Sequence, residues 1–168
     1  KGLTSSYFPL GVMAMRDKVA AHFKDNVFWG GLTYNAHPVG LATALAVIEV
    51  LEEEKLVENS ARMGEVMRGH MERMKAKHRS VGAVRNIGLF GIVEVVKNSK
   101  GERIAPYNGA HPAMGAMSKF FLDNGLFTIF RWDNFMCNPP LTIDEPTLKE
   151  AFDIIDRGLE ITDAAFEG

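Results

Sequence analysis

The sequence has a single cysteine and no long apolar run. Cys137 is the only cysteine among 168 residues, so the chain can form neither an internal disulfide nor a cysteine-rich metal cluster. No apolar stretch approaches the roughly 20 residues that a membrane-spanning helix needs, and the first residues lack the basic-then-apolar order of a signal peptide. We therefore expect a cytoplasmic protein without a membrane partner, in which Cys137 acts as a small buried hydrophobe.

The sequence also lacks an excess of basic or of acidic residues. Lys and Arg number 19 against 21 Asp and Glu, which gives a net charge of -2 and no basic tract that could hold a nucleic-acid backbone. The sequence contains no HExxH, GxSxG, GxxxxGK[ST] or GxGxxG pattern, so metal-dependent, serine-nucleophile and P-loop chemistry lose support. His37 and His111 each precede a proline, and we interpret both as turn hydrogen-bonding groups rather than metal ligands. We expect no metal site.

What the chain contains is a succession of helical and extended patterns. A methionine at every third or fourth position from Met63 to Met74 indicates a helix face that we interpret as core rather than as a cofactor-binding surface. The sequence begins at Lys1 without a methionine, and its first dozen residues read like the middle of a domain, so we expect a piece of a longer chain; removal of a tag would also explain the missing methionine. In chain order the patterns predict a loop leading into a short strand at 1–15, a short helix at 17–24, a loop at 28–37, and helices from Leu41 and at 56–78. They then predict two strands within 81–96 joined near Gly88 and a helix at 110–123. The order ends with a strand at 126–130, its hairpin partner at 134–138 and a final helix capped by Asp144.

Three residues could serve a chemical site. Lys1 precedes an apolar segment in which its amine could be desolvated, as a Schiff-base lysine requires; an ordinary exposed lysine is the alternative. Thr33 lies in GGLTY, where a hydroxyl and backbone N–H groups could hold a phosphate or simply form a turn. Arg131 ends an apolar strand, and its planar guanidinium suits either a substrate carboxylate or a salt bridge with Asp133.

Four segments of the chain resemble, in order, the class III or ω-amino-acid aminotransferases, which depend on pyridoxal 5′-phosphate. KGLTSSYFPLGVM resembles the segment around their cofactor lysine, and GGLTYNAHPVGLATALAVIEVLEEE resembles their GxTYxxHP loop with its alanine-rich helix. VGAVRNIGLFGIVEVV is similar to their V-R-G-x-G-L-x-x-G-I-E pattern, with Asn86 in place of a glycine and Val93 inserted before the glutamate. FRWDNFMCNPPLTIDEPTLKEAFDIIDRGL is similar to their PPL-x-I-x-x-E segment. Within the family the chain looks closest to pyruvate-using members.

The resemblance implies a role for each candidate. Lys1 matches the lysine that carries the cofactor covalently and moves the proton during transamination, which needs an amine that can be neutral near pH 7. Thr33, with the backbone at Leu32, matches the loop that reaches across a homodimer interface to the phosphate of the partner subunit's cofactor. Arg131 resembles the mobile arginine that binds the substrate carboxylate and moves aside for substrates without one. The implied substrates are a small amine and a keto acid such as pyruvate.

The implied fold is α/β: the fold type I, aspartate-aminotransferase-like arrangement. Residues 1–52 would be the end of the large cofactor-binding domain, and residues 53–168 the C-terminal small α+β domain. Independently, the pattern places an internal boundary between about residues 50 and 60. The family's ring-nitrogen aspartate, stacking aromatic residue and phosphate-binding turn all precede the cofactor lysine, so none of them lies in this sequence. We therefore expect the isolated chain to be inactive and its full-length parent to be the transaminase.

Two other functions share these features. Aminomutases and epimerases of the same family use the same motifs, and isomerised amine without turnover of a keto acid would reveal one. A free-standing small-domain module for dimerisation or ligand binding is the non-enzyme alternative, which a mass measurement and the coding region upstream of Lys1 would distinguish.

Overall fold

A computed structural model describes all residues from Lys1 to Gly168, which divide into two compact units, Lys1–Leu56 and Val57–Gly168. The assignment of residues 1–52 to the end of a large domain and of 53–168 to a small domain stays a prediction.

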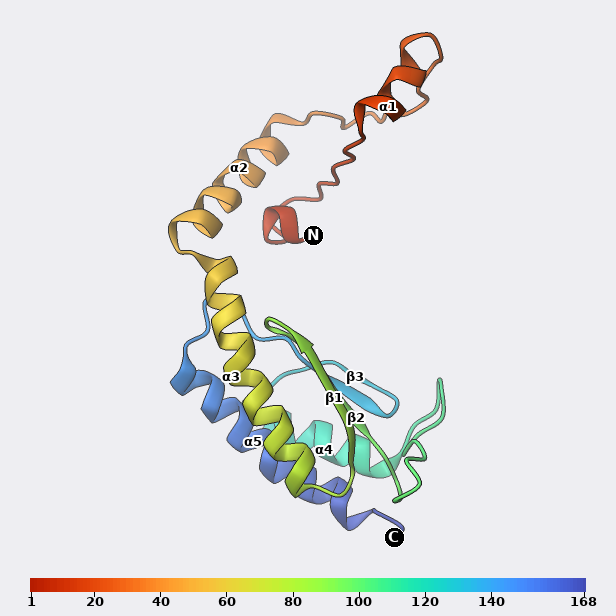
Figure 1. The fold of residues 1–168 in the computed structure, drawn as a ribbon, viewed down its shortest axis with the longest axis vertical. Helices are drawn as coiled ribbons and strands as arrows, with labels where there is room; N and C mark the ends of the chain where they lie inside the picture. The colour runs from red at the N-terminus through yellow and green to blue at the C-terminus, as the bar shows by residue number, and fades with distance from the viewer. The chain divides into compact units, whose positions relative to one another are not determined.

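The first unit contains one long helix and several short helices, which extended segments connect (Figure 1). Its elements are the 3-10 helices η1 (Gly2–Thr4) and η2 (Ala21–Lys24) and the α-helices α1 (Asp17–Ala20) and α2 (Pro38–Glu53). Pro38 stands in the first turn of α2, where its missing N–H costs no hydrogen bond. The helices predicted at 17–24 and from Leu41 are confirmed, the first as α1 followed by η2 and the second three residues longer at its start.

The short strand predicted within residues 1–15 is wrong. This segment forms η1 and then runs without regular structure to α1. A strand needs a neighbour that accepts and donates its backbone hydrogen bonds, and every strand of the chain lies between residues 81 and 137 in the other unit. Leu41 and Leu45 on α2 do not form a core face within the first unit, because they are 44% and 63% exposed.

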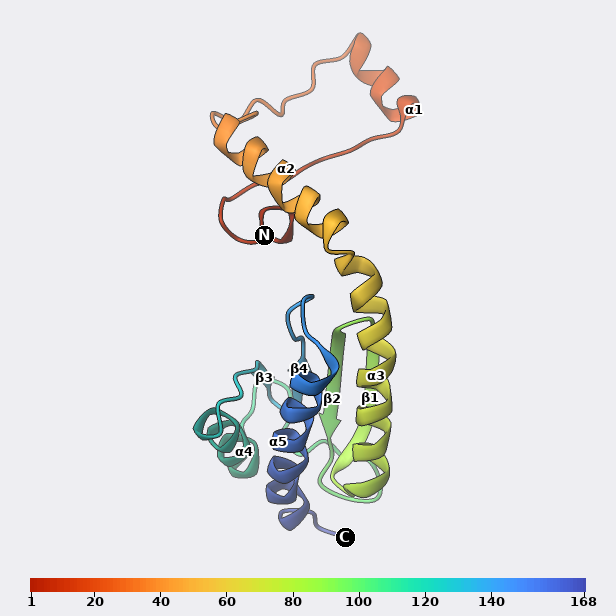
Figure 2. The same ribbon diagram turned by 90° about the vertical axis from the view of Figure 1, so that its left-hand side faces the viewer.

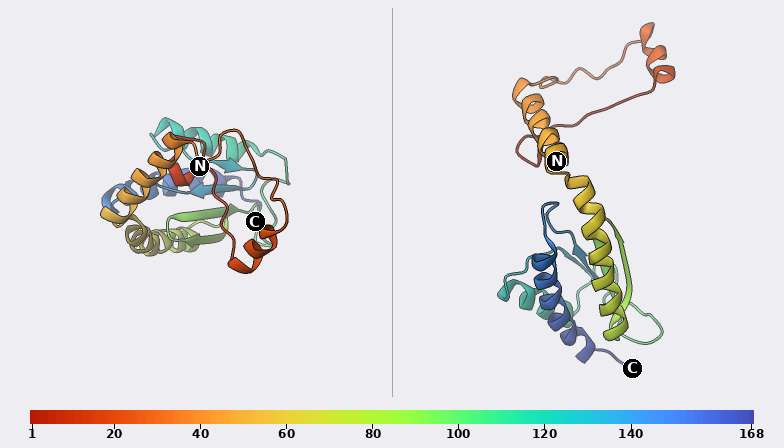
Figure 3. Two further views of the ribbon diagram at one scale, coloured as in Figure 1. Left: turned by 90° about the horizontal axis from the view of Figure 1, so that it is seen from above. Right: turned by 60° about the vertical axis from the view of Figure 1, so that its left-hand side comes forward.

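The second unit is an α+β structure of three helices and a four-stranded antiparallel sheet (Figure 2). The strands follow the order β1-β2-β4-β3, and β1 and β2 form a hairpin that appears green in Figures 2 and 3. The predicted strand pair joined near Gly88 and the helices predicted at 56–78 and 110–123 are confirmed. The elements are α3 (Leu56–Lys77), β1 (Val81–Ile87), β2 (Phe90–Val95), α4 (Pro112–Asp123), β3 (Phe130–Arg131), β4 (Asn134–Cys137) and α5 (Glu145–Ala164).

The core of the second unit lies between the helices and one face of the sheet. Val93 and Phe135 pair across β2 and β4 and are both fully buried, whereas the next residues on each strand are partly exposed. This alternation shows a sheet with one buried face. The methionine face of α3 is confirmed as core, because Met63, Met67, Met71 and Met74 are at most 4% exposed.

The strand predicted at 126–130 is mostly wrong. Only Phe130 and Arg131 form β3, although β4 is confirmed as the hairpin partner. In the preceding residues the Thr128 hydroxyl donates to the carbonyl oxygen of Met136 at 2.6 Å, so a side chain takes the place of one backbone bond of a regular ladder. Apolar, β-branched composition alone could not reveal that substitution.

The last helix has the predicted cap. The Asp144 carboxylate accepts a hydrogen bond from the backbone N–H of Thr147 at 2.9 Å, and the side-chain and backbone bonds with Thr147 lower the pKa of Asp144. Leu148, Phe152, Ile155 and Leu159 all face the core. None of the helices in the chain has both the length and the apolar character that crossing a membrane requires.

Candidate functional site

Lys1 lies directly before η1, and its backbone is held while its side chain is exposed. The carbonyl oxygen of Lys1 accepts hydrogen bonds from the backbone N–H groups of Thr4 at 3.3 Å and Ser6 at 2.9 Å. Thr4 is fully buried and donates its hydroxyl hydrogen to the carbonyl oxygen of Phe8. Within the first unit the Lys1 amine is therefore presented on a fixed turn without an ion-pair partner, and the unit does not supply the desolvation that a Schiff-base lysine needs.

Ser5 and Ser6 shape the turn behind Lys1. Their φ angles are 47° and 64°, which is a left-handed conformation that residues other than glycine adopt at a cost. Such conformations persist only where surrounding contacts hold them, and they occur often at functional sites. The left-handed turn at Ser5 and Ser6 is therefore the feature near Lys1 that is most typical of a functional site.

Leu32 and Thr33 differ in whether their hydrogen-bond donors are already used within the first unit. The N–H of Leu32 donates to the carbonyl oxygen of Gly30 at 3.0 Å, and the carbonyl oxygen of Leu32 accepts from Asn35 at 3.0 Å. Neither the N–H nor the hydroxyl group of Thr33 has a partner within the first unit, and the residue is exposed. An oxyanion at this loop would therefore meet two donors of Thr33, while the backbone of Leu32 serves to shape the loop.

Asn35 is a residue that sequence reasoning missed. Its side-chain amide donates to the carbonyl oxygen of Gly30 at 2.9 Å, which closes the loop around Thr33. The sequence signal that could have identified it is its position two residues after Thr33, the candidate phosphate-binding threonine, in a loop with two glycines. Asn side chains commonly form hydrogen bonds with the backbone in turns.

Arg131 ends β3 in the second unit, and Asp133, its alternative salt-bridge partner, pairs with another arginine. Asp133 is 4% exposed, and its carboxylate lies 3.5 Å from the Nε atom of Arg103. Arg131 is exposed, and it forms no ion pair within the second unit. The local salt bridge between Arg131 and Asp133, which the sequence left open, is therefore not formed, and the guanidinium group of Arg131 is available for an external carboxylate.

The histidines that precede prolines have different roles. The Nδ1 atom of His111 accepts from the backbone N–H of Ala113 at 3.2 Å and so caps α4, which confirms its interpretation as a turn group. For His37 the interpretation as a turn hydrogen-bonding group is wrong: its ring lies between Phe8 and Tyr34, at centroid distances of 5.1 Å and 5.8 Å, and its Nδ1 atom is buried without a hydrogen-bond partner. No three His, Cys, Asp or Glu side chains come together in a way that could hold a metal ion.

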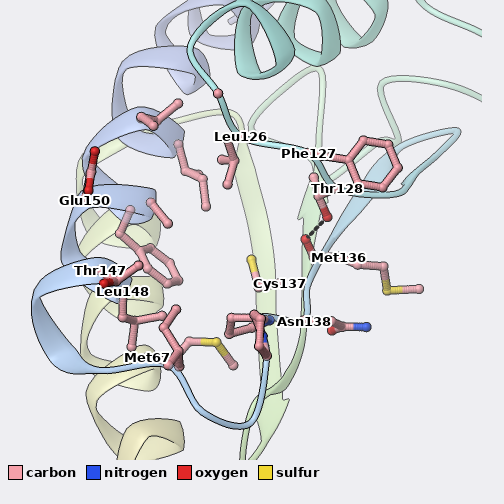
Figure 4. Close-up of a pocket in the computed structure, with 18 of the residues that line it drawn as sticks. Met67, Leu126, Phe127, Thr128, Met136, Cys137, Asn138, Thr147, Leu148 and Glu150 are labelled. Carbon is pink, nitrogen blue, oxygen red and sulfur yellow. Dashed lines mark hydrogen bonds between the residues drawn. The ribbon is translucent and has the colours of Figure 1, made fainter. Parts of the chain in front are cut away.

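A pocket of 420 Å³ in the second unit contains none of the predicted site residues (Figure 4). It lies between α5 and the segments that flank β3 and β4, and most of its walls are apolar. Cys137 reaches this pocket, but burial raises the pKa of its thiol to about 12, so it remains a protonated thiol near neutral pH. The interpretation of Cys137 as a buried hydrophobe is confirmed.

The comparisons with known proteins decide the family. Residues 1–159 match the family model described as Aminotransferase class-III. The chain belongs to this family. The resemblance found in the four sequence segments is thereby confirmed, and with it the mixed α/β, fold type I architecture, because the solved structures that resemble the chain are transaminases.

Individual relatives cover nearly all of this chain. The putrescine–pyruvate aminotransferase of Pseudomonas aeruginosa is 32% identical over an alignment of 168 positions, which covers 98% of this chain and 36% of that protein. Among solved structures, the taurine:2-oxoglutarate aminotransferase of Bifidobacterium kashiwanohense, in complex with pyridoxal phosphate and glutamate, matches with a TM-score of 0.91 at 30% identity and covers 98% of this chain and 37% of that one. An S-selective transaminase from Arthrobacter sp. with alanine bound matches with a TM-score of 0.87 at 26% identity, over 100% of this chain and 37% of that one. The chain thus spans little more than a third of the length of these relatives.

Proposed function

We propose that the protein to which this chain belongs is a pyridoxal 5′-phosphate-dependent transaminase that exchanges an amino group between an amine or ω-amino acid and a keto acid such as pyruvate. The observation that carries the proposal is the match of residues 1–159 to the class III family, because it covers the lysine, threonine and arginine segments together. Relatives whose names specify pyruvate as the acceptor support the choice of keto acid.

The residues of the chain fit the chemistry of this cofactor. Lys1 offers a primary amine that no ion pair engages within its unit, and Thr33 offers a free hydroxyl and a free N–H, which are the donors that a phosphate group accepts. When bound, the cofactor supplies the electron sink that allows the substrate carbon to lose a proton. Lys1 Nζ takes that proton, which requires the neutral amine, and Arg131 orients a substrate through its carboxylate.

We also propose a homodimer in which the Thr33 loop of one subunit serves the phosphate of the other. The exposure of Leu32 and Thr33 and the two unused donors of Thr33 support this arrangement, since both donors remain open to a phosphate group from another subunit. A cytoplasmic location is part of the same proposal.

The test uses the product of the complete gene. Purified protein with pyridoxal phosphate, an amine donor and pyruvate is expected to form alanine and to show the visible absorption of a lysine–cofactor Schiff base. Lys1→Ala should remove that absorption and lower alanine formation by about 10²- to 10⁴-fold or more, because both the covalent attachment and the base are lost.

The control is Lys24→Ala, which removes another exposed lysine of the first unit. It should retain both the absorption and the activity. The proposal fails if Lys1→Ala keeps both signals, or if the native protein isomerises the amine without consuming the keto acid.

A further inference from the structure

The turn between β3 and β4 carries an unusual residue. It has only two residues, Trp132 and Asp133, because Arg131 pairs directly with Asn134. The φ angle of Trp132 is 49°, at the first position of a two-residue hairpin loop, where a positive φ normally selects glycine. A bulky indole in this conformation is strained, so neighbouring contacts must hold the turn.

Two contacts from the segment after β2 hold this turn. The ring of Tyr107 lies 4.2 Å from that of Trp132, with an angle of 53° between the ring planes. Arg103 pairs with the nearly buried carboxylate of Asp133 at 3.5 Å. In addition, the backbone N–H of Val95 donates to the carbonyl oxygen of Asp133 at 2.7 Å, which ties the turn to the end of β2.

These contacts decide what Arg131 can bind. The carboxylate nearest to it in sequence is already paired with Arg103, and the backbone of Arg131 is fixed by the strand pair with Asn134. If Arg103 lost its charge, Asp133 would be a nearly buried carboxylate without a cation, and Arg131 is the arginine nearest to it in sequence. An internal partner of this kind competes directly with a substrate carboxylate.

We propose that Trp132, Asp133 and Arg103 are positioning residues that hold the backbone of Arg131 in place and keep its guanidinium group unpaired for a substrate carboxylate. The inference rests on the proposed function, since it takes Arg131 as the residue that binds the carboxylate. Tertiary contacts hold the strained turn, so the strand that carries Arg131 is in place before the substrate arrives, while its guanidinium group stays unpaired.

The experiment measures the KM for pyruvate in the product of the complete gene. Arg103→Gln should raise the KM by about tenfold and change kcat by less than about twofold, because it weakens binding of a carboxylate rather than the proton transfer. Trp132→Gly, which tolerates the positive φ but lacks the indole, should raise the KM in the same direction. The single-turnover rate at which 1-phenylethylamine, an amine without a carboxylate, gives its amino group to the cofactor in the absence of pyruvate should change by less than about twofold in both variants.

Two further variants separate positioning from folding. Arg103→Lys keeps a cation beside Asp133 and should restore most of the affinity for pyruvate. Arg157→Gln makes the same chemical change at an arginine that packs over Phe120 at 5.6 Å elsewhere in the second unit, and should leave the KM unchanged.

The outcomes distinguish this inference from the function on which it rests. Arg131→Ala should raise the KM for pyruvate; if it does not, the role of Arg131 in the proposed function is wrong. If Arg131→Ala raises the KM while Arg103→Gln and Trp132→Gly leave it unchanged, Arg131 binds the carboxylate and the positioning proposal is overturned. An equal loss with pyruvate and with 1-phenylethylamine would also overturn it.

Discussion

At the scale of single residues, His78 connects two helices through both of its ring nitrogens. Its Nδ1 atom lies 2.7 Å from Asp163 Oδ2, and its Nε2 atom lies 2.9 Å from Asp156 Oδ1, although the residue is only 2% exposed. Ser80 donates its backbone N–H and its hydroxyl to the other oxygen of Asp163, at 2.9 Å and 2.6 Å. The end of α3 is thereby joined to α5 by a partly buried polar network rather than by apolar packing alone.

The two carboxyl groups make this network sensitive to acid. Burial would raise the pKa of Asp156, but its hydrogen bonds with Lys77 and His78 outweigh burial and lower it. For Asp163, the hydrogen bonds with Ser80 and His78 likewise outweigh burial and lower the pKa. A carboxyl group with a lower pKa in the folded state binds fewer protons than in the unfolded state. Its contribution is therefore present above the ordinary Asp pKa and is lost as the pH falls through the lowered value.

We predict that Asp163→Asn destabilises the chain near neutral pH by about 1–3 kcal/mol, because His78 and Ser80 lose a charged acceptor. The difference from wild type should shrink as the pH falls through the carboxyl range, from about pH 5 to pH 2. Urea unfolding at a series of pH values measures both effects. Asp123→Asn is the control, since Asp123 forms an exposed pair with Lys119 on α4 and should matter by less than about 1 kcal/mol at any pH. Parallel stability curves for Asp163→Asn and wild type would contradict the prediction.

At the scale of elements, α3 and the β1–β2 turn approach each other through glycines. A Cβ atom at Gly64 would lie 2.5 Å from the Cα atom of Gly88, which has a φ angle of 52°. The side-chain amide of Asn86 donates to the carbonyl oxygens of Gly64 at 2.8 Å and Gly88 at 2.9 Å. Asn86, which departs from the family's glycine, thus fastens the turn to the helix.

We predict opposite effects for two glycine substitutions in α3. Gly64→Ala should destabilise the second unit by about 1–3 kcal/mol, because the added methyl group meets backbone atoms that cannot move aside without separating helix and turn. Gly69→Ala should stabilise it by about 0.5–1 kcal/mol, because a Cβ atom there meets only the flexible end of Arg73 and alanine favours the helix. Thermal and urea unfolding of both variants make the comparison, and a stabilised Gly64→Ala variant would show that the close approach is absent in solution.

At the scale of the whole molecule, burial is distributed unevenly. The buried apolar cluster consists entirely of residues between Met63 and Leu159, whereas Ala44 is the one buried apolar side chain within the helices of the first unit. Trp29, Leu32 and Tyr34, in the loop of the first unit that carries Thr33, are each more than 70% exposed. Apolar side chains exposed together in this way are typical of surfaces that bind another protein surface, which agrees with the proposed dimer.

The proposed sharing of the site between subunits predicts complementation. Lys1→Ala and Thr33→Ala subunits, mixed and allowed to exchange, should form dimers in which one site carries both substitutions and the other carries neither. At a cofactor concentration too low for either variant alone, the mixture should regain about one quarter of the wild-type alanine formation, since about half of the dimers are mixed. Mass spectrometry of the intact dimers confirms exchange. Activity equal to the mean of the two parents, despite exchange, would show that Lys1 and Thr33 of one subunit serve the same site.

The sequence by itself determined the family, most helices, the β1–β2 hairpin and the core methionines of α3. These features depend on residues that are close in sequence. A helical period, a capping aspartate and a short family motif can each be recognised without knowing the tertiary contacts. The strand in residues 1–15 and most of the strand at 126–130 were wrong for the converse reason. A strand exists only with a partner, and Thr128 shows that a single side chain can replace the ladder bond.

Only the tertiary structure decided which groups are free to act. Arg131 is available because Arg103, distant in sequence, pairs with Asp133, and no pattern in the sequence joins these two residues. Thr33 keeps its donors while Leu32 uses its own, which depends on how the loop folds back to Gly30. Residue type determines how many hydrogen bonds and ion pairs a side chain can form. Folding determines which of these are already made with neighbouring residues, and therefore which donors and charges remain free.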